Sequence, residues 1–105
     1  MKTEELYAIA DVSITVIGEG LSISPYVARC LTVFQRAGLR TNIHALGTNV
    51  EGSLSAILDC IKECHSLLHK DGVARIVTNL TLTSRTDRPQ SIQEKIHSVT
   101  SKVSL

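Results

Sequence analysis

The sequence predicts a fold of the α+β class, in which two β-α-β units share one antiparallel sheet and a third helix follows. Period-two alternation of apolar and polar residues marks strands at residues 8–17, 40–45 and 73–83. Helical periodicity separates these strands, and a glycine-bracketed stretch at residues 47–52 supplies one more short strand. The order βαββαβ is typical of the ferredoxin-like fold, and right-handed crossovers then give the sheet order 4-1-3-2 with both helices on one face.

The first strand is expected over residues 8–17 and the first helix after a glycine-rich break. One face of this strand is entirely apolar and should meet the core: Ala8, Ala10, Val12, Ile14 and Val16. Ser24 is expected to be the N-cap of the helix and Pro25 its first residue, because the first helical turn leaves its N–H groups unpaired. Gly38 is expected to end this helix.

The central stretch, residues 47–52, connects the second strand to the second helix. Gly47 permits a bend after the strand at residues 40–45, and a short third strand is expected around Thr48 and Glu51. Gly52 should permit a sharp entry into a helix over residues 54–69, which places the Glu51 carboxylate before the positive N-terminal end of that helix. A charged residue between two glycines is hard to explain by core packing, so Glu51 is a candidate functional residue.

The C-terminal part completes the second β-α-β unit and adds a helix. The fourth strand is expected over residues 73–83, with Ile76, Leu80 and Leu82 on its core face. Ser91 and Glu94 have the spacing of a capping box, which predicts a last helix beginning there.

Composition narrows the possible functions. The 105 residues are expected to form a single domain, residues 1–105, with a net charge of +1 and no block of like charge that would indicate nucleic-acid binding. No apolar run approaches the roughly 20 residues of a membrane-spanning helix, so a cytoplasmic protein with no membrane partner is expected. The three cysteines fall within helical patterns and are expected to be buried thiols: Cys30, Cys60 and Cys64. A metal site at Cys60, Cys64 and the adjacent His65 would lack a third convincing ligand, so no metal is expected.

The sheet face that the two helices leave uncovered is expected to carry most of the polar strand residues. These are Asp11, Ser13, Thr15, Asn42, His44, Asn79 and Thr81. The third strand is too short to reveal its phase, and either Thr48 or Glu51 should point to this open face. It is either a solvated sheet face, or it is covered by a partner or by the C-terminal helix and forms a pocket for a polar heterocycle. Neither a phosphate-binding glycine loop nor a nucleophile elbow is present.

Several motifs resemble one family closely over residues 8–103. They are Asp11-Val12-Ser13, Gly18-Glu19-Gly20 with Ser22-Ile23-Ser24 and Tyr26-Val27, Gly47-Thr48-x-x-Glu51-Gly52, and Arg85-x-Asp87-Arg88. In these motifs the sequence resembles the small thiamine-binding proteins of ferredoxin-like fold. Thr48 and Glu51 match the central motif, and Asp11 takes a position that is usually acidic in the family. His44-Ala45-Leu46 departs from bacterial members, which often have Asn-Pro-Met there.

The resemblance implies binding of thiamine, or of its hydroxymethyl-aminopyrimidine half, without catalysis and without a cofactor, in a cytosolic homo-oligomer that is usually a tetramer of paired dimers. The expected ligand-binding residues at the open face are Asp11, Ser13, His44, Thr48 and Glu51. Two alternatives stay open. One is a small-molecule enzyme that uses His44 with Asp11 or Glu51 as acid and base, and the other is a regulatory protein-interaction module.

Overall fold

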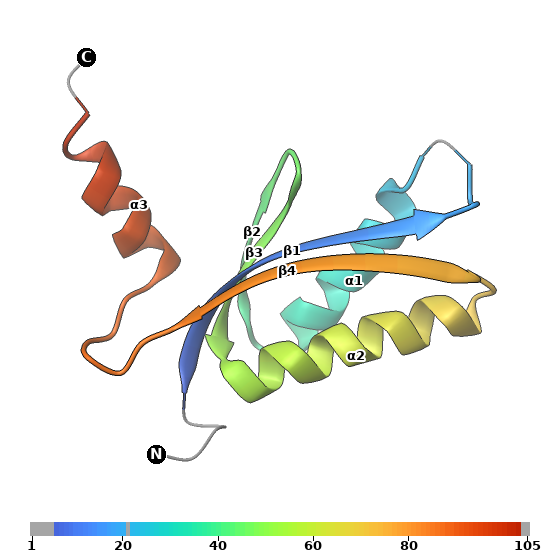
Figure 1. Ribbon diagram of the computed structural model, residues 1–105, viewed down its shortest axis with the longest axis horizontal. Helices are drawn as coiled ribbons and strands as arrows, with labels where there is room; N and C mark the ends of the chain where they lie inside the picture. The colour runs from blue at the N-terminus through green and yellow to red at the C-terminus, as the bar shows by residue number, and fades with distance from the viewer. Residues whose placement is uncertain (1–5, 21, 104–105) are drawn as a thin grey trace.

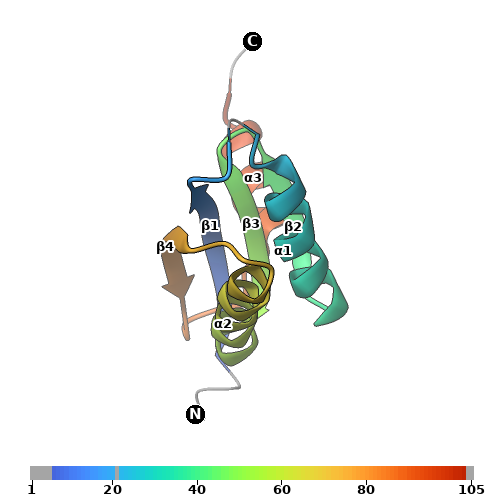
Figure 2. The same cartoon turned by 90° about the vertical axis from the view of Figure 1, so that its right-hand side faces the viewer.

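The structure is a computed structural model that describes residues 6–20 and 22–103. Its elements are β1 (Tyr7–Ile17), α1 (Ser24–Arg36), β2 (Arg40–His44), β3 (Gly47–Ser53), α2 (Leu54–Lys70), β4 (Arg75–Ser84) and α3 (Ile92–Thr100). The strands form one antiparallel sheet in the order β2-β3-β1-β4, and α1 and α2 lie together on one side of it (Figures 1 and 2). The predicted ferredoxin-like fold with an additional helix is confirmed.

The hydrophobic core lies between the sheet and the two covering helices. The alternate apolar residues of β1 are buried as predicted, from Ala8 at 1% exposure to Ile14 at 9%. Phe34 of α1 and Ile57 of α2 are among the largest fully buried side chains. An ion pair between Arg29 and Asp71 joins the two helices at the surface.

The first turn of α1 differs from the prediction, because Ser24 is not its N-cap. The N-cap is Ile23, whose backbone is already close to helical and whose carbonyl oxygen accepts from the N–H groups of Tyr26 and Val27. Ser24 is therefore the first helical residue, and no side chain caps the helix. Since Pro25 has no N–H to offer, the first turn leaves fewer donors for a serine side chain to satisfy.

Gly52 also has a different role from the predicted one. β3 continues to Ser53, which is the N-cap of α2 and whose hydroxyl accepts from the N–H of Ala56 at 3.4 Å. Gly52 therefore lies within the strand, with a φ of 154°. A Cβ at this position would come within 2.3 Å of the Leu39 side chain, so Gly52 allows a close approach of that leucine to the sheet.

The β2–β3 hairpin leaves the plane of the sheet at its tip. Pairing between β1 and β3 ends at Val12 and Thr48, whereas pairing between β1 and β4 continues to Ile17 and Arg75. The hairpin therefore projects away from the second half of β1 (Figure 1). This divergence opens a space between the hairpin, β1 and α1.

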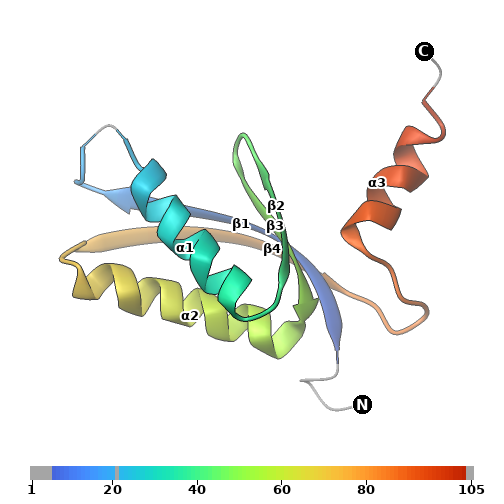
Figure 3. The same cartoon turned by 180° about the vertical axis from the view of Figure 1, so that it is seen from behind.

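The last helix, α3, stands apart from α1 and α2 (Figures 1 and 3). The predicted start of this helix is confirmed, because Ser91 is its N-cap and the Ser91 hydroxyl accepts from the N–H of Glu94 at 3.1 Å; the Glu94 carboxylate accepts from the same hydroxyl at 3.2 Å. Ile92 is buried against the body, but Ile96, Val99 and Val103 are 51 to 65% exposed. The apolar stripe of α3 is therefore largely uncovered in the single chain.

Candidate functional site

The sheet register brings several predicted polar residues together on the open face. Asp11 of β1 lies opposite Asn49 of β3 on one side and Thr81 of β4 on the other. Asn49 in turn lies opposite Asn42 of β2. Because directly opposed residues of an antiparallel sheet share a face, these four side chains form one polar row across the sheet.

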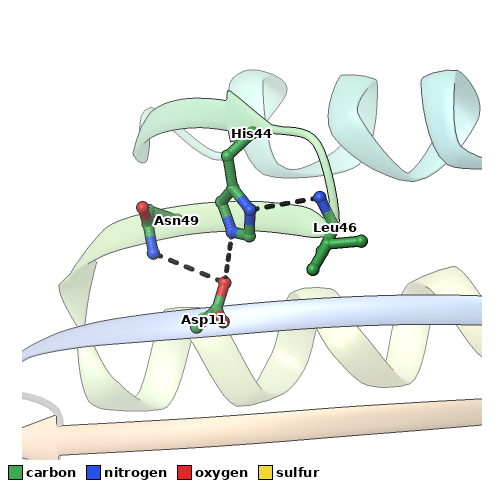
Figure 4. Close-up of polar contacts among 4 residues, drawn as sticks. All are labelled: Asp11, His44, Leu46 and Asn49. Carbon is green, nitrogen blue, oxygen red and sulfur yellow. Dashed lines mark hydrogen bonds and ion pairs between the residues drawn. The ribbon is translucent and has the colours of Figure 1, made fainter.

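Asp11 is the centre of a small hydrogen-bonded cluster beside this row (Figure 4). Its Oδ1 lies 2.7 Å from His44 Nε2 and 3.4 Å from the side-chain amide nitrogen of Asn49. The second ring nitrogen of His44, Nδ1, accepts from the backbone N–H of Leu46 at 3.3 Å. The side chains of Asp11 and His44 are 49% and 39% exposed, so the cluster is accessible from solvent.

The hydrogen bonds of His44 define its tautomer. Since Nδ1 accepts from a backbone N–H, the ring proton lies on Nε2 and is donated to the Asp11 carboxylate. Both ring nitrogens are thus hydrogen-bonded, and neither has a free lone pair that could accept a proton from a substrate. No hydrogen bond joins Ser13 to Asp11 or His44 among residues 6–20 and 22–103, so these three residues do not form a hydrolytic triad in this conformation.

Gly47 allows the hairpin tip to approach β1 closely. A Cβ on Gly47 would come within 2.8 Å of the Val12 carbonyl oxygen and 3.3 Å of His44 Cε1. Any larger residue would push the hairpin away from β1 and displace the imidazole. The glycine of the central motif therefore helps to position His44 beside Asp11.

Thr48 was expected at the open face, but it lies on the other side of the sheet. It pairs with Val12 and Ile43, so its side chain lies on the helix side of the sheet, and it is only 6% exposed. Glu51, three residues later, takes the opposite face. The alternation of β3 therefore separates the two polar residues of the motif onto two sides of the same strand.

On the helix side, a cavity of about 620 Å³ lies between α1, the β2–β3 hairpin and the unpaired edge of β1. Its wall is mainly apolar and includes Ile14, Val27, Leu31, Phe34, Ile43 and Leu46. Ser13, His44 and Thr48 also line it, so three of the five predicted ligand-binding residues border one cavity. Its size and its few polar groups are those of a small-molecule site.

Thr48 is the most enclosed of these polar residues. Its hydroxyl makes no hydrogen bond to another residue of the described chain, although the side chain is almost fully buried. A hydroxyl that borders the cavity can donate one hydrogen bond and accept two from a bound molecule. His44 lines the same cavity and also contacts Asp11, so it links the cavity to the polar row of the open face.

Glu51 lies on the open face but is 3% exposed. Its Oε2 accepts from the Tyr7 hydroxyl at 2.6 Å and from the backbone N–H of Ile92, the first residue of α3, at 3.3 Å. Glu51 precedes α2 by two residues, but the helix whose N-terminal N–H it accepts from is α3. Partial burial of the phenol and its hydrogen bond to Glu51 raise the pKa of Tyr7 to about 12.

The three cysteines are buried, as the sequence predicted. The thiol of Cys64 is directed toward the Cys30 carbonyl oxygen, 3.8 Å away. Its hydrogen bond with the Cys30 side chain and its burial raise the pKa of Cys64, and burial raises the pKa of Cys60. Within the described residues, no three potential metal ligands gather at one place, and no helix has the length and apolarity needed to cross a membrane.

Two residues of the site were missed from the sequence. Asn49 contacts Asp11, and Tyr7 contacts Glu51. Asn49 could have been found, because it is two residues before Glu51 and must share its face of the strand. The contact of Tyr7 with Glu51 depends on the register between β1 and β3, which no local pattern of the sequence reveals.

The fold and the cavity define the chain as a ferredoxin-like α+β protein with a cavity of ligand size. The model of the family described as thiamine-binding protein matches residues 10–100. The chain therefore belongs to the thiamine-binding protein family.

Several relatives agree with this assignment. A UPF0045 protein of Synechocystis sp. is 38% identical over 93% of this chain and 81% of its own length. A UPF0045 protein of Methanocaldococcus jannaschii is 37% identical over 87% of this chain and 90% of its own length. A crystal structure of a hypothetical protein from that organism has a TM-score of 0.83 at 36% identity and covers 90% of this chain and 96% of its own.

A second crystal structure supports the fold alone. It is a protein of Thermotoga maritima whose name proposes a role in thiamine biosynthesis or salvage. Its TM-score is 0.74 at 19% identity, with 89% of this chain and 98% of that chain covered.

Proposed function

We propose that this chain is a single-domain, non-catalytic binding protein for thiamine or its hydroxymethyl-aminopyrimidine half, and that it acts in the cytoplasm as a carrier or sensor. The observation that carries the proposal is the cavity of about 620 Å³, which is bordered by Ser13, His44 and Thr48. Membership of the thiamine-binding protein family supports the choice of ligand. The name of the Thermotoga maritima neighbour points to the same chemistry.

The proposed ligand lies in the cavity and reaches the open face only at the rim. The aminopyrimidine ring fits between the apolar side chains of α1 and the hairpin, where the Thr48 hydroxyl can bond its ring nitrogen or amino group. The cationic thiazolium lies at the rim beside His44, where the exposed Asp11 carboxylate favours a positive charge. Direct contact of the ligand with Glu51 stays a prediction, since that carboxylate already accepts two hydrogen bonds.

We propose further that the protein acts as a homo-oligomer, a dimer at minimum and a tetramer in its complete form. The exposed apolar stripe of α3 and the exposed Ile17 and Val77 of the sheet support this proposal, because a single chain leaves them uncovered. Closed two-fold assemblies are the commonest way to bury such surfaces.

The Thr48→Val variant tests the proposed binding site. Valine keeps the shape of threonine but removes the hydroxyl, so thiamine affinity should fall by about tenfold, which corresponds to one hydrogen bond of roughly 1.4 kcal/mol. Calorimetric titration measures this difference. Thr41→Val is the matched control, because Thr41 lies on the same side of the neighbouring strand and does not line the cavity.

If the Thr48→Val and wild-type proteins bind thiamine with equal affinity, the ligand does not bind through Thr48 in this cavity. If the wild-type protein gives no heat of binding, thiamine is not its ligand. The enzyme alternative rests on the 2.7 Å contact between Asp11 and His44, and it requires His44 to release the Leu46 N–H before its Nδ1 can accept a proton. It predicts that thiamine incubated with the protein is chemically changed, whereas the binding proposal predicts that it is recovered intact.

A further inference from the structure

His44 connects the hairpin tip to the rim of the cavity through both nitrogens of its ring. Nε2 lies 2.7 Å from Asp11 Oδ1, and Nδ1 accepts from the backbone N–H of Leu46 at 3.3 Å (Figure 4). The side chains of His44 and Leu46 both line the cavity, and Leu46 is 85% exposed. The neutral imidazole therefore ties Asp11 of β1 to the turn that forms one wall of the cavity.

A proton on Nδ1 breaks one of these two contacts and strengthens the other. The proton comes from solvent and converts Nδ1 from an acceptor into a donor, so the Leu46 N–H loses its partner. Nε2 still donates to Asp11, and that contact becomes an ion pair between an imidazolium and a carboxylate. Imidazoles ordinarily change charge between about pH 5 and about pH 8, which is a range that folded proteins tolerate.

The surroundings of His44 leave its own proton as the main variable charge at the rim. Within the described part of the chain, Asp11 is the one charged side chain that His44 contacts. β3 places the uncharged Asn49 beside Asp11, and the charged residue of β2, Arg40, lies at the other end of that strand. α1 contributes one titratable side chain to the cavity wall, the buried thiol of Cys30. Protonation of His44 therefore changes the rim from net negative to net neutral.

We propose that His44 is a pH-dependent switch of the cavity, which admits a cationic ligand when the ring is neutral and opposes it when the ring is protonated. With the neutral ring, the Asp11 carboxylate attracts a positive charge at the rim. The imidazolium compensates that carboxylate, adds a positive charge to the cavity wall and releases the N–H of Leu46. Proton and ligand therefore compete. The inference rests on the proposed function, because it requires a cation such as thiamine in this cavity.

Calorimetric titration with thiamine at about pH 7.5 and about pH 5.5 tests this competition. Affinity should be about fivefold lower at the lower pH, as expected for a coupling of roughly tenfold between two like charges near the protein surface. His44→Gln keeps a side-chain N–H for Asp11 but takes up no proton, so its affinity should change by less than about twofold. Any contribution of Cys30, or of the protonation of thiamine itself, persists in this variant and is thereby separated from that of His44.

His97→Gln is the matched control, because His97 is exposed on α3 and does not line the cavity. It should keep the wild-type pH dependence. NMR spectroscopy of the wild type gives a second measurement. Since the coupling between two ligands is reciprocal, thiamine added at about pH 6 should move the ring resonances of His44 toward those of the neutral imidazole.

Three results would overturn the switch even though thiamine binds. They are a wild-type affinity that does not change with pH, a pH dependence that His44→Gln retains, and His44 resonances that thiamine does not move. The NMR measurement decides the matter if circular dichroism shows that His44→Gln is not folded. Absence of heat at both pH values would instead contradict the proposed function, and the switch with it.

Discussion

The residues of the central motif act on two different surfaces of the molecule. Thr48 faces the cavity beneath α1, whereas Asn49 and Glu51 belong to the open face. Gly47 brings the hairpin close enough to β1 for His44 to reach Asp11. The short strand β3 therefore contributes Thr48 to the candidate ligand cavity and Glu51 to the contact with the first turn of α3.

Tyr7 allows the Glu51 contact to be tested by pH. Its pKa is raised from 10.0 to about 12, so between these values the folded protein holds a proton that the unfolded chain releases. This contribution to stability is complete below pH 10 and is lost as the pH rises toward about 12. The ultraviolet absorbance of tyrosinate should show a transition near pH 12 that is absent in Tyr7→Phe.

Tyr26 serves as the internal control, since it is the second of the two tyrosines in the chain. Its hydrogen bond to Glu19 also raises its pKa, and its transition should persist in Tyr7→Phe. If the transition near pH 12 persists in Tyr7→Phe, it belongs to Tyr26 and the assignment to Tyr7 is wrong.

At the scale of elements, α3 is attached to the body at its first turn. The attachment consists of the buried Ile92 side chain and the hydrogen bond from its N–H to Glu51. A carboxylate near the N-terminus of a helix is favourable because the helix dipole is positive there. The rest of α3 contributes an exposed apolar stripe, so its position depends on few contacts within the chain.

The Glu51→Gln variant should loosen α3 and leave the sheet intact. Glutamine keeps an acceptor oxygen but removes the charge, so the local stability of α3 should fall by about 1 kcal/mol. Amide hydrogen exchange over residues 92–100 should then accelerate by about fivefold. Exchange in β1 and β3 should not change.

Glu94→Gln is the control for Glu51→Gln, because it removes an exposed carboxylate of the first turn of α3, the turn that Glu51 contacts from β3. Its effect on exchange should be smaller. If Glu51→Gln leaves α3 unchanged but lowers thiamine affinity tenfold or more, Glu51 contacts the ligand directly, as the sequence predicted.

At the scale of the whole molecule, the single chain is more extended than its length requires. Its radius of gyration is 15.1 Å, whereas a compact chain of this length has about 13 Å. The excess follows from α3, which extends away from the other helices (Figure 3). An extended helix with an apolar stripe is expected to pack against another subunit.

Val99→Asp tests this expectation in the assembled protein. Val99 is 65% exposed and lies in the apolar stripe of α3, so an aspartate there should disfavour its burial and lower the mass measured by sedimentation. Ser98→Asp introduces the same charge outside the stripe and should have little effect. Sedimentation of the wild type as an 11.4 kDa species at micromolar concentration would contradict the oligomer altogether.

Most of the fold could be predicted from the sequence because its signals are local. The alternation in β1 and the capping box at Ser91 were sufficient to identify those elements, and the confirmed sheet order followed from right-handed crossovers. The N-cap of α1 could not be assigned correctly, because Ser24 and Ile23 differ by one residue and helix ends are weakly specified.

The sequence by itself also determined a set of candidate ligand-binding residues, namely Asp11, Ser13, His44, Thr48 and Glu51. Only the tertiary structure decided where they point. The side of β3 on which Thr48 lies depends on its register with β1, because a shift of one residue exchanges the two faces. The partner of Glu51 depends on where α3 returns to the sheet, a contact between residues 41 positions apart that no local pattern specifies.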